Sequence, residues 1–270
     1  MARMNLTRQA LLVSGLLAMA AAGWAQFGAG GARLATTDSF DGAFNWCRTY
    51  YRRNPSGDGG GWSTDYPRAD QNFSFRLAEL TKTLISRDSR GDINHLVVSL
   101  TQPELARCPW IMMAEVGSLY LDQTEAVALR NYLLKGGFLW VDDFWGSRAW
   151  NVWEEQIAKA LPPGQYPIVD LPLGHELFHM LYDVREIPQI PSINFWFGSG
   201  GGTSERGADS AEPHVRAIFD ERHRMIVLIT HNTDFGDSFE REGDNHEYFL
   251  RFAAAGYAFG VNALLYAMTH

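Results

Sequence analysis

Two short apolar stretches separated by one capped helix constrain the fold more than any other feature of this 270-residue sequence. Residues 110–116 read WIMMAEV and residues 138–142 read FLWVD, and neither stretch alternates apolar with polar side chains. A strand is apolar on both sides when helices cover both faces of its sheet. The helix predicted at residues 122–135 has Asp122 and Glu125 in a capping box. This strand–helix–strand order predicts an α/β fold with a mostly parallel sheet.

The rest of the sequence continues this alternation. We predict further strands at residues 44–51, 95–101 and 168–171, and a β-hairpin at residues 215–220 and 225–230 near the C-terminal part. An apolar stripe at 4-3-4 spacing predicts a helix that contains Phe73, Leu77, Leu80 and Leu84. A second helix is expected to be capped by Ser147, and a third spans residues 247–268.

The first 25 residues have the features of a secretory signal peptide. Arg3 and Arg8 precede an apolar centre, and small residues allow cleavage after Ala25. We therefore expect an exported protein, periplasmic or extracellular, with a flexible lead-in at residues 26–42 and one domain at residues 43–270. No later stretch is expected to be long and apolar enough to cross a membrane.

Charge and cysteine content limit the classes of partner and chemistry. The formal net charge is −8, which argues against nucleic-acid binding because phosphates require clustered Lys and Arg. Cys47 and Cys108 are the two cysteines. They form a disulfide in an oxidising compartment or remain two buried thiols, and the sequence leaves both alternatives open.

Chemically active side chains follow several predicted strands, at the point where each strand ends. Loops that leave the carboxyl ends of parallel strands meet at one edge of the sheet, where ligands bind. We expect a site at this carboxyl edge, with Asp143 and His231 as catalytic candidates. The expected ligand-binding residues are Trp62, Asp65, Tyr66, Glu115, Asp142, Trp145, His175, Asp234 and Asp237.

Each candidate also has a structural interpretation. Asp142 and Asp143 should point in opposite directions if the strand continues through them, and either could accept backbone hydrogen bonds in the following turn. His231, at a strand end, is expected to be more exposed than a core histidine and to titrate near neutrality. Alternatively, its ring binds a loop carbonyl.

Trp62, Tyr66, Phe144 and Trp145 could form an aromatic shelf or simply pack in the core. The glycine runs at residues 59–61 and 200–202 match no phosphate-binding motif and are expected to be flexible loops.

Residues 175–179, HELFH, match the His-Glu-x-x-His zinc motif. That motif requires a helix that places both imidazoles on one face. Pro172 and Gly174 lie directly upstream, and no third ligand follows at a recognised spacing. We therefore disfavour a zinc peptidase, and interpret His175, Glu176 and His179 as part of a loop with a short helix.

Four segments in this order resemble a bacterial family called domain of unknown function 4159. They read GGGWSTDYPRADQNFSFRLAELT, GGFLWVDDFWG, LPLGHELFH and THNTDFGDSFER, and the resemblance covers residues 43–268. It implies a class I glutamine amidotransferase-like fold, a flavodoxin-type three-layer sandwich, with the β-hairpin as an insertion. The family has no assigned reaction. Its members are expected to carry Pro in place of Glu176, which makes the zinc-motif match accidental.

The resemblance also bears on function. In amidotransferases a nucleophilic Cys occupies the turn that corresponds here to residues 141–146, and the later His corresponds to His231. No Cys is present in that turn, so thiol-based glutamine hydrolysis is excluded. Three functions remain: binding of a small polar ligand of sugar or cell-wall type, hydrolysis by Asp143 and His231 with or without a metal, and interaction within an envelope assembly. The sequence identifies no cofactor, no metal and no oligomeric state.

Overall fold

A seven-stranded sheet lies at the centre of the fold in the computed structural model, which describes residues 32–270. The five strands β3, β1, β4, β6 and β9 are adjacent in that order and parallel, and β8 and β7 follow as antiparallel neighbours. The strands are β1 Trp46–Tyr50, β3 His95–Ser99, β4 Trp110–Ala114, β6 Phe138–Asp142, β7 Ile168–Asp170, β8 His214–Phe219 and β9 Met225–His231. A separate small ladder pairs β2 Arg52–Arg53 with β5 Leu119–Tyr120. The predicted α/β class with a mostly parallel sheet is confirmed.

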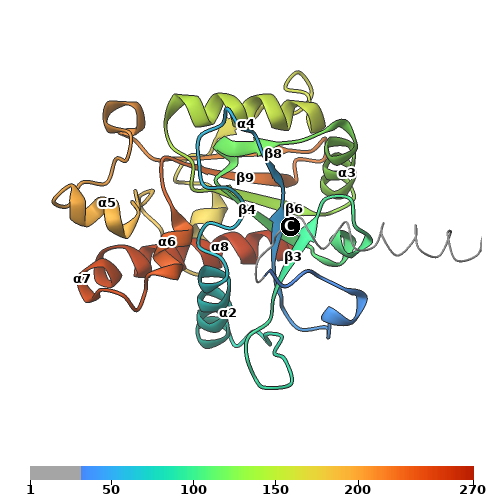
Figure 1. Cartoon of the computed structure of the whole chain (residues 1–270), viewed down its shortest axis with the longest axis horizontal. Helices are drawn as coiled ribbons and strands as arrows, with labels where there is room; N and C mark the ends of the chain where they lie inside the picture. The colour runs from blue at the N-terminus through green and yellow to red at the C-terminus, as the bar shows by residue number, and fades with distance from the viewer. Residues whose placement is uncertain (1–31) are drawn as a thin grey trace, which may run out of the picture. The chain divides into compact units, whose positions relative to one another are not determined.

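Helices cover both faces of the sheet. Figure 1 shows α3 and α4 on one face, and α2, α6 and α8 on the other. The helices are α2 Arg68–Thr81, α3 Gln123–Leu134, α4 Gly146–Ala160, α5 Ile193–Gly198, α6 Phe235–Glu240, α7 His246–Tyr248 and α8 Ala254–Thr269. The predicted capping box of α3 is present, since the Asp122 side chain accepts from the Glu125 amide.

The central strands divide their side chains between two apolar cores. Ile111 and Met113 of β4 pack in the core that contains Leu129 of α3. Trp110 and Met112 pack in the core that contains Phe73 of α2. Successive residues of a strand point to opposite faces, so a strand buried on both faces must be apolar at every position. The continuous apolar runs in the sequence have this cause.

The β-hairpin forms as predicted, but it is not an insertion. β9 pairs in parallel with β6 in the interior of the sheet, and β8 continues the same sheet on the other side of β9. The hairpin is therefore part of the framework that positions the carboxyl edge.

Part of the predicted lead-in packs against the fold. The predicted signal peptide and its cleavage site after Ala25 lie outside the described residues. One compact unit spans Arg33–His270. The Ala35 amide donates to the Val97 carbonyl at 2.9 Å, so this part of the predicted flexible lead-in is held against β3.

The C-terminal helical stretch is one core element. Among the described residues, His246–Thr269 is long and apolar enough to cross a membrane by length and composition, so the expectation that no later stretch meets this criterion is wrong. However, 61% of its apolar window is buried inside the fold. Phe259 and Val261 lie in the same core as Phe73. This burial is what a core helix of an α/β sandwich requires.

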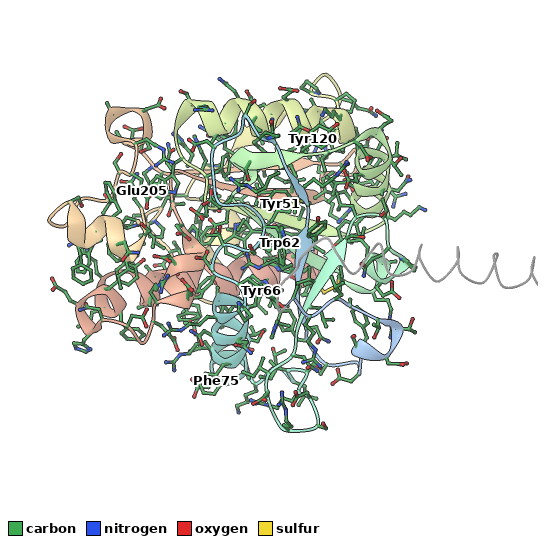
Figure 2. The ribbon with its side chains drawn as sticks, in the orientation of Figure 1. Tyr51, Trp62, Tyr66, Phe75, Tyr120 and Glu205 are labelled. Carbon is green, nitrogen blue, oxygen red and sulfur yellow. A yellow bond between two sulfur atoms is a disulfide. The ribbon has the colours of Figure 1, made fainter. Side chains whose placement is uncertain are left out.

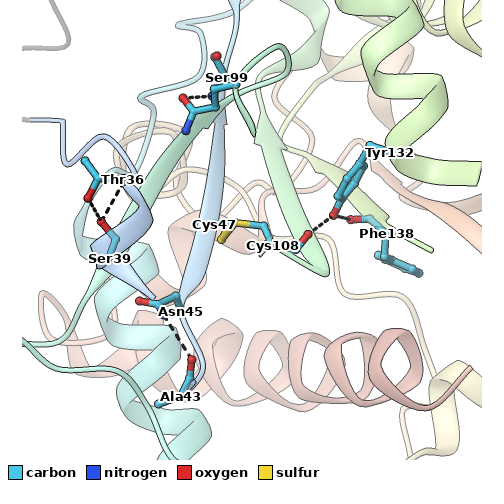
Figure 3. The surroundings of a disulfide bond; sticks show 10 residues. Thr36, Ser39, Ala43, Asn45, Cys47, Ser99, Cys108, Tyr132 and Phe138 are labelled. Carbon is cyan, nitrogen blue, oxygen red and sulfur yellow. Dashed lines mark hydrogen bonds between the residues drawn. A yellow bond between two sulfur atoms is a disulfide. The ribbon is translucent and has the colours of Figure 1, made fainter. Parts of the chain in front are cut away.

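Cys47 and Cys108 form a disulfide, which decides between the two alternatives left by the sequence. The bond joins β1 to the segment that leads into β4 (Figure 3). Beside it, the Tyr132 hydroxyl lies 2.7 Å from the Cys108 carbonyl and 3.2 Å from the Phe138 carbonyl. The disulfide therefore fixes the start of β4 relative to β1 and, through Tyr132, relative to β6.

Removal of this disulfide is expected to destabilise the domain. The two cysteines are 61 residues apart in sequence, and closing a loop of that length typically contributes about 2–4 kcal/mol by restricting the unfolded chain. The Cys47→Ala/Cys108→Ala variant should lose this free energy of unfolding in urea titrations followed by tryptophan fluorescence. Wild-type protein unfolded with a reductant present should show the same shift, and equal midpoints in all three samples would contradict the expectation.

Candidate functional site

The ends of β4, β6 and β9 meet at the carboxyl edge of the sheet, as predicted. The Glu115 amide donates to the Asp142 carbonyl at 3.0 Å, and the Asn232 amide donates to the Phe144 carbonyl at 3.0 Å. The Gly236 amide donates to Asp142 Oδ2 at 3.0 Å. The turn after β6 and the segment after β9 are therefore directly hydrogen-bonded.

Six acidic side chains gather at this edge. Asp142 and Asp143 come from β6 and its following turn, and Asp234 and Asp237 come from the start of α6. We use the name carboxylate cluster for these four together with Glu115 and Asp65, which are close enough for charge repulsion between them to raise pKa values. Asp142, Asp143, Asp234 and Asp237 are each at most 5% exposed. Asp65 precedes α2 and lies in the same loop as Trp62 and Tyr66. Both aromatic residues are labelled in Figure 2.

The backbone at the carboxylate cluster is strained. Among the described residues, six non-glycine residues have positive φ, and four of them lie here: Asp65 at 63°, Glu115 at 54°, Asp143 at 56° and Asn232 at 62°. A side chain in this region costs about 1 kcal/mol or more, and such residues concentrate at functional sites. The fold thus maintains Asp65, Glu115 and Asp143, together with the adjacent Asn232, in their positions against a conformational cost.

Asp142 has the hydrogen-bond pattern of a protonated carboxyl group. Thr230 Oγ1 lies 2.5 Å from Asp142 Oδ1 and 3.1 Å from the Val141 carbonyl, and it accepts from Trp140 Nε1 at 2.9 Å. The Thr230 hydroxyl has one proton and faces two acceptors. A proton on Asp142 Oδ1 satisfies both, because Asp142 then donates to Thr230 and Thr230 donates to Val141. Burial raises the pKa of Asp142 to about 7, in agreement with this count.

The other members of the carboxylate cluster also resist ionisation. Burial raises the pKa of Glu115 to about 7 and that of Asp237 to about 6. Burial, followed by repulsion from neighbouring carboxylates, raises the pKa values of Asp65, Asp143 and Asp234 well above the ordinary range. Without a compensating cation, the carboxylate cluster must therefore retain protons near neutral pH.

Arg48 holds the loop that carries Asp65. Its guanidinium forms a fully buried ion pair with Asp70 of α2, with Nη2 2.6 Å from Asp70 Oδ1. Nη1 donates to the carbonyls of Trp62 at 3.3 Å and Thr64 at 2.9 Å. Burial alone would lower the pKa of Arg48, but Asp70 more than offsets this effect and the pKa lies above its ordinary value. Arg48 thus fixes the backbone on the N-terminal side of Asp65.

His231 lies away from the carboxylate cluster. Its ring lies 4.8 Å from the Phe144 ring and 5.0 Å from the Trp150 ring, with Nε2 3.2 Å from the Gly146 carbonyl and Nδ1 3.3 Å from Arg216 Nη1. The expectation of an exposed, neutrally titrating histidine is wrong: His231 is 6% exposed, and burial lowers its pKa to about 4. Within residues 32–270, no hydrogen bond or ion pair joins it to Asp143.

Asp142 and Asp143 do not separate as a continued strand would require. β6 ends at Asp142, and the positive φ of Asp143 interrupts the alternation. Asp143 Oδ1 accepts from Trp145 Nε1 at 3.1 Å, and after burial the charges of Glu115, Asp65 and Asp142 raise its pKa most. Both aspartates therefore belong to the carboxylate cluster.

The structure does not bring His175 to this edge. Its ring lies 5.5 Å from the Tyr266 ring and 6.3 Å from that of Phe219, which pairs with the first residue of β9 at the opposite end of the sheet. Residues Glu176–His179 form a 3₁₀ helix, not the α-helix that the zinc motif requires. His179 is bound to Asp183 and to the Leu173 carbonyl. The loop-and-short-helix interpretation of this segment is confirmed.

The predicted aromatic shelf is divided into two groups. Trp62 packs between Tyr50 and Tyr66, each at a ring distance of 5.6 Å. Phe144 instead stacks on Trp150 at 6.1 Å, within the core on the α4 side. Only the first group flanks the loop that carries Asp65.

The family model of a domain of unknown function, DUF4159, matches residues 50–268. The chain belongs to this family. The sequence resemblance is thereby confirmed over nearly the same range. A comparison with curated proteins gives no match.

Glycines pack against the carboxylate cluster of this DUF4159 domain, a role that no sequence motif indicated. A Cβ at Gly59 would collide with Glu115 Oε2, and a Cβ at Gly60 would lie 2.8 Å from Thr64 Oγ1. A Cβ at Gly236 would collide with Asp65 Oδ2 and lie 3.2 Å from Asp234 Oδ1. The glycine run at residues 59–61, interpreted above as a flexible loop, therefore packs closely on the carboxylate cluster.

Two surface cavities of the DUF4159 domain lie elsewhere. One of about 610 Å³ is lined by the C-terminal part of α4 and by Tyr166 and Ile168. Another of about 410 Å³ lies beside Cys108 and Tyr132. Neither lining includes a member of the carboxylate cluster. The carboxylate cluster is therefore the candidate site, because its acidic groups are buried and its backbone has positive φ at several residues.

Proposed function

We propose that this DUF4159 protein is exported and binds a small polar ligand at the carboxylate cluster. One observation carries the proposal: six acidic side chains from separate segments are held together, largely buried, at the carboxyl edge of a parallel sheet. Such an arrangement is destabilising without a partner. Ligands that donate several hydrogen bonds, such as sugars and amino sugars, match an array of carboxyl acceptors.

Export is supported by two independent features. The N-terminal sequence has the order of charges and apolar residues expected of a signal peptide. The Cys47–Cys108 disulfide fits an oxidising compartment, since disulfides are rare in reducing cytosol.

We further infer that the fold is of the class I glutamine amidotransferase-like type. The parallel β4, α3 and β6, followed by a turn into α4, correspond to the unit that carries the nucleophile in that fold. Here the turn contains Asp142 and Asp143 instead of Cys. The proposed binding site is thus built from carboxylates on a sheet edge where amidotransferases place a thiol.

Thermal denaturation with candidate ligands tests the binding function. N-acetylglucosamine, N-acetylmuramic acid and muramyl dipeptide should be screened, and a ligand at ten times its Kd should raise the melting temperature by about 4 °C. Asp143→Asn should abolish the shift, because Asp143 is central to the carboxylate cluster. His231→Gln should retain it, since His231 faces the other core.

The matched control is Asp92→Asn, which makes the same chemical change at an exposed ion pair. It should leave any ligand shift unchanged. Equal shifts in wild type, Asp143→Asn and Asp92→Asn would refute the location of the site, and no shift with any compound would refute the ligand class.

A hydrolase is the second candidate, and the pKa of Glu115 favours it. A carboxyl group with a pKa of about 7 is suited to proton transfer at neutral pH. The hydrolytic pair would then be Glu115 and Asp143 rather than Asp143 and His231. Turnover of p-nitrophenyl esters and glycosides that is lost in Glu115→Gln and retained in His231→Gln would identify this activity.

A further inference from the structure

We propose that Asp65, Asp234 and Asp237 form a binding site for a hard divalent cation of the Ca²⁺, Mg²⁺ or Mn²⁺ class. This inference rests on the proposed function, because it assigns a specific occupant to part of the carboxylate cluster. A bound cation would in turn provide an anchor for hydroxyl or anionic groups of the ligand.

The three side chains are close enough to share one ion. Each offers a carboxylate oxygen, and these oxygens all lie within 4.8 Å of one another. Calcium–oxygen bonds are about 2.3–2.6 Å long, so two ligands on opposite sides of one ion are separated by up to about 5 Å. The geometry therefore allows all three residues to contact a single cation with little movement.

Asp65 provides an independent indication of a missing partner. Its Oδ2 is buried and has no hydrogen-bond partner among the described residues. The absence of a side chain at Gly236 allows this oxygen to approach the start of α6 next to Asp234. A buried, unpaired carboxylate oxygen costs several kcal/mol, and a cation between Asp65, Asp234 and Asp237 would remove that cost.

Neighbouring groups already orient the other two ligands. Asp234 Oδ1 accepts from the Asp237 amide at 2.7 Å, which leaves Oδ2 available. Asp237 Oδ2 accepts from the Ile193 amide at 2.7 Å, and the Tyr248 hydroxyl lies 3.5 Å away. Supporting hydrogen bonds of this kind fix carboxylate ligands in metal sites. The site is therefore preorganised on its α6 side.

The donor set selects the class of ion. All three ligands are carboxylates, with no His or Cys in the set. Oxygen-only sites suit calcium, magnesium and manganese, whereas zinc and copper prefer nitrogen and sulfur. Protein cations neutralise the set only in part. Arg48 is paired with Asp70, and Arg241, whose Nε lies 3.5 Å from Asp237 Oδ1, is shared with Glu240 and Asp244.

Calorimetric titration of the metal-free full chain with CaCl₂, MgCl₂ and MnCl₂ tests the site. At least one of the three ions should bind with one-to-one stoichiometry and raise the melting temperature. Asp65→Asn should lower the affinity at least tenfold, because it removes the unpaired carboxylate charge. Asp92→Asn, an equivalent change at an exposed position, should bind as wild type does.

A spectroscopic readout covers the case in which Asp65→Asn folds poorly. Terbium is a hard-ion substitute for calcium, and Tyr248 is close enough to Asp237 to sensitise its emission. Calcium should displace the terbium and quench that emission in wild-type protein. Absence of saturable binding by folded wild type, or undiminished binding in a folded Asp65→Asn variant, would overturn the proposal.

Failure of the cation site is distinguishable from failure of the proposed function. If a ligand still raises the melting temperature with a chelator present, the proposed binding function stands and the role of the cation is refuted. Cation binding without any ligand shift would confirm the ion site and refute the ligand class.

Discussion

Replacing Arg48 with Met should lower the free energy of unfolding by about 3–5 kcal/mol, the usual cost of removing one partner from a buried ion pair. The Arg48 and Asp70 side chains are both fully buried. Methionine fills much of the volume of arginine but leaves the Asp70 carboxylate without its partner. It also removes the donors to the Trp62 and Thr64 carbonyls. Urea unfolding followed by far-ultraviolet circular dichroism measures the loss.

A double variant separates the effect of the unpaired Asp70 charge on stability from the effect of the loop position on cation binding. Arg48→Met/Asp70→Leu removes both charges, and a buried ion pair replaced by apolar residues often regains the lost stability. We therefore expect most of the 3–5 kcal/mol to return. Cation binding should nevertheless remain weakened, because the backbone before Asp65 is no longer held. A double variant as unstable as Arg48→Met, or one that binds cations as wild type does, would contradict this role of Arg48.

The fold was predictable because its signals are local. The apolar runs of β4 and β6 reflect burial on both faces, and the Asp122–Glu125 capping box marks the start of α3. Helix ends that depend on distant partners were not predictable. α4 begins at Gly146 rather than after Ser147, and its first turn is capped by the Asp209 carboxylate, which accepts from the Ser147 amide at 2.8 Å.

Dependence on a distant partner also explains why the predicted end of α2 is wrong. The apolar stripe predicted a helix that includes Leu84, but the helix ends at Thr81, where Lys82 has a φ of 62°. Leu84 is 81% exposed, and its carbonyl accepts from the Phe44 amide at 2.9 Å. A backbone pairing 40 residues away in sequence thus determines where this helix stops.

The location of the candidate site followed from the topology of the sheet. Which residues belong to the candidate site depended on the strand register. Parallel strands end at one edge, so the meeting of Glu115, Asp142 and Asp234 could be anticipated. In the observed ladder Trp140 pairs with Leu228 and Val141 with Ile229. Paired residues point to the same face, so Thr230 shares the face of Asp142 and His231 takes the opposite one. No sequence pattern specifies that register by itself.

Asp142→Asn should stabilise the metal-free protein at pH 8 and have little effect at pH 4. The pKa of Asp142 is about 7 in the folded protein, against an ordinary value of 3.8. Below pH 4 both the folded and the unfolded chain hold this proton. Between pH 4 and 7 the unfolded chain releases it first, so the free energy of unfolding of the wild type falls as pH rises. Above pH 7 this decrease in the free energy of unfolding should level off, and the titration of Asp142 should account for roughly 4 kcal/mol of it.

Asparagine reproduces the protonated carboxyl group without titrating. Its amide can donate to Thr230 Oγ1 and its oxygen can accept from the Gly236 amide, the two contacts that Asp142 makes. Urea unfolding of wild type and Asp142→Asn from pH 4 to 8 in the presence of a chelator measures the difference. The opposing contribution of His231, whose pKa is about 4, is common to both proteins and cancels.

Asp92→Asn again provides the matched control, since its side chain is 64% exposed and its charge is already solvated. Its stability should follow that of the wild type at every pH. An Asp142→Asn variant that is less stable than wild type at pH 8, or a difference that does not change with pH, would mean that Asp142 is ionised in the folded protein. The Thr230 hydroxyl would then have to donate to Asp142 and leave the Val141 carbonyl without that bond, the reverse of the arrangement inferred from the proton count.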